Sequence, residues 1–249
     1  MNAATSQSEL ERAAVPLTPD AILRRLSGCA PCLRGRYAAT LAEVSPRLAW
    51  AGPQRLAATS SVYADPLLRQ EKLAEYVWTE YWGGVFIEDF LRDYRGEYAK
   101  LLTRHALDEV GHGNAFAQYA GRPAPSPAGA PEGLLARDAY AAYQQWANGD
   151  LVAFLSILHV LELRTAVILT HWFCLLETYP GPDRDAIHSL LARISRDEVF
   201  HLTYTLQALD ALLVDDAASR TLTEAFMLSE ADVPTILDAA RRRREGAHA

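Results

Sequence analysis

Two copies of one short motif carry most of the chemistry that this sequence offers. Residues 108–112 (DEVGH) and 197–201 (DEVFH) both read Asp-Glu-Val-x-His, and their glutamates lie 89 residues apart. On a helix, a Glu and a His three positions apart share one face. A single copy is easily a chance or surface pair, whereas two copies preceded by the same aspartate indicate two metal-binding faces. Carboxylate and imidazole donors together suit iron or manganese better than a thiolate-selective metal.

Each motif needs a further carboxylate on the helix that precedes it. If the chain turns back just after Tyr94, Glu80 and Glu109 lie equally far from the turn. The alternative carboxylates, Glu75 and Glu88, would be offset from Glu109 along the helix axis by roughly 7.5 Å and 12 Å respectively. Glu80 is therefore the predicted partner of the first motif.

The partner of the second motif lies inside a long apolar segment, residues 151–176. The segment is long enough to cross a bilayer, but it contains ionisable side chains that make a span unfavourable. These are His159, Glu162, Arg164 and His171. We therefore expect a buried central helix in a protein with no membrane contact. Measured from a turn at residues 180–181, Glu162 and Glu198 differ in height by roughly 1.5 Å, whereas Glu177 would miss by roughly 21 Å.

Signals for helix starts and stops organise the chain into an all-α protein. Caps and first-turn prolines occur at residues 18–20 and 65–66, and residues 121–133 form a Pro/Gly/Ala linker. No stretch alternates with period two, so no sheet is expected. The expected helices cover about 18–28, 34–44, 66–94, 97–119, 134–146, 151–176, 183–213, 219–228 and 234–245.

The order of these helices predicts a four-helix bundle with one long crossover between its second and third helices. Additional short helices flank the bundle at both ends. Residues 1–17 are expected to form a flexible leader, and 18–249 a single helical domain whose metal-binding core covers about 66–213.

Composition narrows the class of protein further. The chain has 249 residues, 50% of them hydrophobic, and a net charge of -7, which fits a globular domain and excludes disordered and collagen-like classes. The acidic balance argues against nucleic-acid binding. The first residues lack the features of a secretory signal, so we expect the cytoplasm. Cys29 and Cys32 have redox-motif spacing without the usual context, so an electron-relaying or regulatory thiol pair stays an open alternative, whereas Cys174 is expected in the core.

One Glu from each of two helices with Glu-x-x-His from each of two others resembles the ferritin-like di-iron carboxylate superfamily. The resemblance implies six metal ligands and no catalytic residue beyond the metal centre. It also implies that Asp108 and Asp197 hydrogen-bond the outer nitrogens of ligand histidines, the alternative being a solvated helix face. The implied ligands are Glu80, Glu109, His112, Glu162, Glu198 and His201.

The resemblance further implies two Fe ions per chain, or one Mn and one Fe, that activate O2 to oxidise a small organic substrate. N-oxygenation or hydroxylation in secondary metabolism would be such a reaction, with electrons from an external reductase or ferredoxin. A homodimer is also expected. Other readings stay open: a ferroxidase or iron-binding protein without organic substrate, an aldehyde-deformylating enzyme, a peroxidase-type enzyme, or an interaction protein with a vestigial site.

Several further residues near the motifs have two readings each. His105, one turn before Glu109, is an extra ligand or a packed histidine; in similar arylamine N-oxygenases the extra histidine precedes the second motif, where this chain has Ile194. His159 and Tyr204 either border the substrate and metals or belong to the core. Glycines within the expected helices either clear room for substrate and O2 or allow tight packing; these are Gly84 and Gly113.

Overall fold

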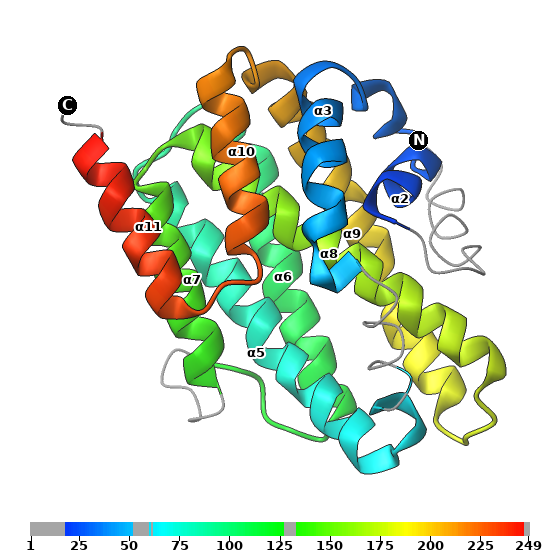
Figure 1. The fold of residues 1–249 in the computed structure, drawn as a ribbon. Helices are drawn as coiled ribbons and strands as arrows, with labels where there is room; N and C mark the ends of the chain where they lie inside the picture. The colour runs from blue at the N-terminus through cyan, green and yellow to red at the C-terminus, as the bar shows by residue number, and fades with distance from the viewer. Residues whose placement is uncertain (1–17, 52–59, 61, 127–132, 247–249) are drawn as a thin grey trace. The chain divides into compact units, whose positions relative to one another are not determined.

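The structure, a computed structural model, describes residues 18–51, 60, 62–126 and 133–246. Within these ranges every regular element is a helix, which confirms the predicted all-α class (Figure 1). The expected leader, 1–17, lies outside the described residues. The chain divides into unit 1, Met1–Ala64 with Leu155–Glu230, and unit 2, Asp65–Phe154 with Ala231–Ala249.

Unit 2 is built around the antiparallel helices α5 (Pro66–Leu91) and α6 (Ala99–Tyr119), which pack side by side (Figure 1). The α5 helix begins where predicted, because the carboxylate of Asp65 accepts hydrogen bonds from the first free backbone N–H groups at 2.8 and 3.2 Å. Helix α7 (Leu134–Ala147) packs against both α5 and α11 (Val233–Gly246).

Glycines allow the close approach of α5 to α6. A Cβ atom added at Gly84 would lie 2.9 Å from the carbonyl oxygen of Ala106 and 2.8 Å from Val110. One added at Gly113 would lie 3.0 Å from the carbonyl oxygen of Val77. The facing helix therefore fills the space at both glycines, which favours tight packing over a passage for substrate.

Unit 1 contains the second long pair, α8 (Leu151–Thr178, of which the first four residues belong to unit 2) and α9 (Arg184–Leu212). Contacts along the pair fix its antiparallel direction. Near the turn, Arg184 Nε donates to the carbonyl oxygen of Leu176 at 2.7 Å, and the rings of Phe173 and His188 lie 5.6 Å apart.

Short helices complete unit 1. They are α2 (Pro19–Arg25), η1 (Ala30–Cys32), α3 (Gly35–Val44), η2 (Ser45–Arg47), η3 (Ala49–Ala51) and α10 (Asp216–Leu228). Helix α3 contacts α9 and α10. The α10 helix starts three residues earlier than expected, because Asp215 caps it by accepting a 2.8 Å hydrogen bond from the N–H of Ala218. The expected end of the first long helix at Tyr94 was also late, since α5 stops at Leu91.

Helix α8 is long and apolar enough to cross a membrane by length and composition, with a mean hydropathy of 1.9 over its most apolar window. Of that window, 67% is buried within the protein, which is typical of the core helix of a soluble protein. Its Arg164 is also satisfied internally, because Nη1 donates to the carbonyl oxygen of Ser229 at 2.7 Å. The cytoplasmic location remains a prediction.

Candidate metal centre

Three predicted ligands of unit 2 converge between α5 and α6, and we call Glu80, Glu109 and His112 the α5–α6 triad. Nδ1 of His112 lies 3.5 Å from Oε2 of Glu80 and 3.6 Å from Oε1 of Glu109. All three side chains are buried. Glu80, at the same height as the first motif, is thus the carboxylate that faces His112.

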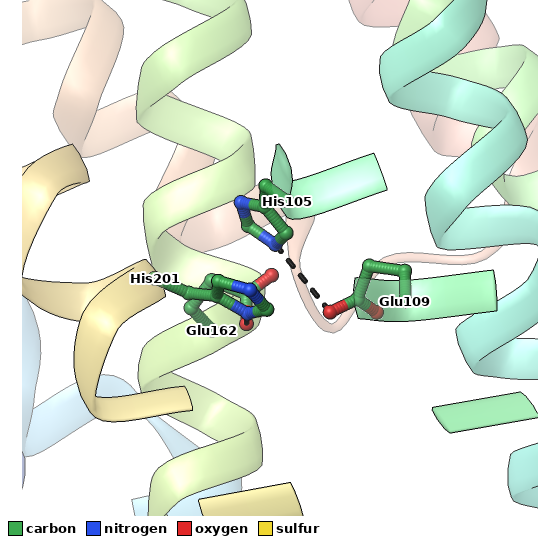
Figure 2. A group of neighbouring side chains, drawn as sticks. All are labelled: His105, Glu109, Glu162 and His201. Carbon is green, nitrogen blue, oxygen red and sulfur yellow. Dashed lines mark ion pairs between the residues drawn. The ribbon is translucent and has the colours of Figure 1, made fainter. Parts of the chain in front are cut away.

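His105 adds a second imidazole to this group. Its Nε2 lies 3.4 Å from Oε1 of Glu109, an ion pair drawn as a dashed line in Figure 2, and its side chain is fully buried. Two successive turns of α6 therefore carry His105, Glu109 and His112 on one face. His105 is therefore still a candidate for an extra ligand.

The α8–α9 triad of unit 1 consists of Glu162, Glu198 and His201. Nδ1 of His201 lies 3.7 Å from Oε2 of Glu162 and 3.8 Å from Oε2 of Glu198. These residues are buried as well, two of them completely. Figure 2 labels Glu162 on α8 and His201 on α9. Each long helix pair thus contains the same set of two carboxylates and one histidine.

The separations within each triad fit metal ligation. At 3.4 to 3.8 Å, the His and Glu atoms are too far apart for good hydrogen bonds. Two atoms that each lie about 2.0–2.2 Å from one ion can be no more than about 4.4 Å apart, and all five distances satisfy this limit. Buried ionised carboxylates are costly without a compensating positive charge. The oxygen and nitrogen donors suit Fe or Mn.

Asp108 and Asp197, which precede the motif glutamates, are both partly exposed. Asp108 lies 3.4 Å from Nε of Arg104 on the same helix. Their predicted role as partners of the ligand histidines stays a prediction.

His159 lies in a directed chain of hydrogen bonds within unit 1. Burial raises the pKa of Tyr37 well above its usual value, so its hydroxyl stays protonated and donates to Nε2 of His159 at 2.7 Å. Nδ1 then carries the ring proton and donates to Oγ1 of Thr205 at 2.9 Å. The Thr205 hydroxyl donates to the carbonyl oxygen of His201 at 2.7 Å.

Burial keeps His159 neutral although this residue lies one turn before Glu162. Burial lowers the pKa of His159 to about 3, and the nearby Glu162 only partly offsets the effect. Both ring nitrogens are engaged by hydroxyl groups, so His159 positions α8 against α3 and α9. Tyr37, which sequence reasoning missed, has no motif around it; only its place on α3 brings it to His159.

The remaining candidates belong mainly to packing. Tyr204 is buried, and its ring lies 5.3 Å from that of Phe200. None of the three cysteines takes part in a disulfide. Burial raises the pKa of the Cys32 thiol, with a smaller contribution from Asp210, and the Sγ of Cys29 lies 3.7 Å from Oγ1 of Thr203. The structure contains no Cys29–Cys32 disulfide, and a protonated Cys32 is a weak nucleophile.

A second residue near the site was also missed by the sequence reasoning. A Cβ atom added at Gly83 would lie 3.2 Å from the hydroxyl oxygen of Tyr140 and 3.3 Å from Oε2 of Glu109. Tyr140 of α7 and a triad carboxylate therefore border the same small space above Gly83. The sequence does not indicate that Tyr140 lies near Glu109, because a Pro/Gly/Ala linker separates α7 from α6 and leaves its direction open.

No protein-family model, curated protein or solved structure matches this chain. The buried glutamates and histidines of the triads form groups that could hold a metal ion. Metal binding is therefore supported by the residues of the chain itself, through their identity, burial and separations.

Proposed function

We propose that the α5–α6 and α8–α9 triads together hold two metal ions, Fe/Fe or Mn/Fe, inside a four-helix bundle of the ferritin-like type. We further propose that the protein is an oxidoreductase that uses O2 to oxidise a small organic substrate. The observation that carries this proposal is the occurrence, twice in one chain, of a buried triad of two glutamates and one histidine.

The number and kind of donors support two ions rather than one. Four carboxylates carry a formal charge of four minus, which two divalent ions would neutralise. The glutamates and histidines of both triads, together with His105, are buried and belong to groups that could hold a metal ion.

Two such ions, when bound, would supply the electrons and the open coordination positions that O2 activation requires. The residues of the chain would hold the ions and keep water away. Leu158 and Ile194 stand one turn before Glu162 and Glu198 and are buried, so they would shield the ligands from solvent. Asp108 and Asp197 would accept a hydrogen bond from the Nε2–H of the motif histidines and so keep Nδ1 available to the metal.

Oxidation with O2 also requires partners. We propose an external electron donor, a reductase or a ferredoxin, together with a homodimeric state and a cytoplasmic location. The fully protonated state expected of Cys32 argues against electron relay through the Cys29–Cys32 pair.

Metal stoichiometry tests the proposal directly. After anaerobic loading with Fe(II) and removal of excess metal, the protein should retain about two Fe per chain and consume O2 when exposed to air. Glu109→Ala and Glu198→Ala should each lose bound iron and O2 consumption, whereas Glu88→Ala, at an exposed position on α5, should keep both. A wild-type protein that retains no metal would overturn the proposal.

The same measurement separates the proposal from an iron-storing function. A ferroxidase or storage protein would take up many irons per chain and form a large cage. Two irons per chain in a small assembly would leave an organic substrate as the target of the oxidation.

A further inference from the structure

A pocket between α5 and α7 of unit 2 has a size and lining that suit a small molecule. Its volume is about 120 Å³. For comparison, a cavity of roughly 150 Å³ binds benzene in another protein. The pocket therefore fits a molecule with a single ring. Its lining residues are Trp82, Val85, Phe86, Asp89, Arg137, Tyr140, Ala141 and Gln144.

Aromatic side chains form much of this lining. The rings of Phe86 and Tyr140 lie 5.5 Å apart in a tilted arrangement, and Trp82 belongs to the same wall. Aromatic rings favour offset or edge-to-face contact with another ring. Arg137 and Ala141 are exposed, so the pocket opens to solvent on the α7 side. An aromatic ring could thus enter from solvent and pack against the wall.

The charges of the lining are already compensated. Asp89 lies 2.7 Å from Nη2 of Arg92, and Arg137 donates to Asp138 at 2.9 Å. A charged ligand would gain little from either group, so the pocket favours a neutral molecule.

Three buried polar atoms of the lining residues lack hydrogen bonds, and one of them, Oδ1 of Asp89, has the ion pair with Arg92 instead. Nε1 of Trp82 and one amide oxygen of Gln144 are buried and have no hydrogen-bond partner in the described part of the chain. Such atoms are rare in folded proteins and call for an explanation, such as a bound water or ligand group. A single hydroxyl or amino substituent on the ring could accept from the indole N–H or donate to the amide oxygen after a small rotation of Gln144.

One lining residue, Tyr140, also lies near the α5–α6 triad. The Tyr140 hydroxyl borders the space above Gly83 together with Oε2 of Glu109. A Cβ atom at Gly83 would be in tight contact with both atoms, so the Tyr140 hydroxyl and Oε2 of Glu109 pack directly over this glycine. A ring held in the pocket would therefore lie on the side of Glu109 that faces α7.

We infer that this pocket binds a neutral, single-ring aromatic molecule with one polar substituent and holds it next to the α5–α6 triad as the substrate. The binding rests on the pocket alone, whereas the role as substrate rests on the proposed function.

Phenol is a suitable probe, because it is neutral, has one ring and can both donate and accept a hydrogen bond. In an NMR titration of the full-length chain, phenol should bind the wild type. Ala141→Phe, which fills the pocket from its exposed rim, should weaken binding by about tenfold or more. Gln145→Phe is the matched control, since Gln145 is exposed on α7 and does not line the pocket.

Gln144→Leu separates the polar contact from the apolar one. It should weaken the binding of phenol and leave that of toluene unchanged, because toluene lacks the hydroxyl group. In the Mn(II)-loaded protein, the relaxation rates of bound phenol protons should exceed those in the Zn(II)-loaded protein. The Ala141→Phe variant should lose this difference.

The outcomes distinguish the two proposals. Absence of phenol binding, or equal binding by Ala141→Phe, would overturn the pocket even if two metals are bound. Phenol binding with the expected variant pattern in a protein that retains no metal would support the pocket and overturn the proposed function. Equal relaxation with Mn(II) and Zn(II) would overturn the position next to the metals.

Discussion

At the scale of residues, the hydroxyl groups around His159 decide what this histidine does. Tyr37 donates to one ring nitrogen and Thr205 accepts from the other, so the imidazole is held in a single neutral tautomer. The last hydrogen bond of the chain ends on the carbonyl oxygen of His201. The hydrogen bonds therefore connect His159 to the backbone of a candidate ligand residue.

Loss of the first hydroxyl should leave a buried nitrogen unsatisfied. We expect Tyr37→Phe to lower the free energy of unfolding by about 1–3 kcal/mol, measured by urea denaturation. In a His159→Leu background the same substitution should cost under about 0.5 kcal/mol, because its partner is already absent. Equal costs in both backgrounds would show that the Tyr37 hydroxyl acts elsewhere.

The lowered pKa of His159 makes stability depend on pH. As the pH falls through 6.5, His159 is protonated in the unfolded chain. In the folded chain it is protonated only at about pH 3. The free energy of unfolding therefore falls with the pH in this range, by about 2 kcal/mol between pH 7 and pH 5 from this group. His159→Gln should remove that share of the loss in metal-free protein. Denaturation curves whose pH dependence is the same in wild type and variant would contradict the assignment.

At the scale of elements, the contact between α5 and α6 sets the spacing of the first triad. Gly84 faces the backbone of α6 and Gly113 faces the backbone of α5, so the helices approach closely at the height of the ligands. Any side chain at these positions would push the helices apart and move Glu80 away from His112. The cost of glycine in a helix is thus offset by the geometry it allows.

Two glycines of this helix pair should respond oppositely to alanine. Gly84→Ala should lower the free energy of unfolding by about 1–3 kcal/mol, because its Cβ meets Val110 and the Ala106 carbonyl. Gly111→Ala should raise it by up to about 1 kcal/mol, since nothing lies within 4 Å of the added Cβ and alanine favours the helix. Urea denaturation of both variants checks the pair, and destabilisation by Gly111→Ala would contradict this account.

At the scale of the whole molecule, the buried carboxylates of the triads destabilise the folded state when no metal is bound. Both triads and His105 are buried, and the chain as a whole has a net charge of -7, so the carboxylates repel one another where little water can screen them. Metal ions that bind both triads would stabilise the folded chain at the expense of the unfolded one.

Metal should therefore raise the stability of the protein, and ligands from both units should be needed. At a Mn(II) concentration 100 times the dissociation constant, each bound ion adds about 2.7 kcal/mol to the free energy of unfolding. The melting temperature should rise clearly, and a chelator should reverse the rise. Glu80→Gln in unit 2 and Glu162→Gln in unit 1 should each abolish most of the rise, whereas Glu88→Gln should keep it. A full rise in either variant would mean that the substituted residue is not a ligand, and a loss of about half of the rise would mean that the two triads bind metal separately.

Local sequence patterns were enough to predict the all-α class, the approximate positions of the helices and the two repeated motifs. Caps such as Asp65, helical periodicity and distance from a turn are local properties, so they can be derived without knowing how distant segments pack. They also sufficed to choose Glu80 over Glu88 as the carboxylate near the first motif, because two residues equally far from a turn lie side by side in an antiparallel pair.

Only the tertiary structure decided which side chains surround these residues. Tyr37 reaches His159 from α3, and Tyr140 reaches the space beside Glu109 from α7, although both lie on helices with no metal motif. Gly84 allows α6 to pack closely against α5, and this depends on the atoms of α6 that face it. The physical reason is the same in each case: such contacts are made between segments distant in sequence, and their geometry follows from the packing of whole helices.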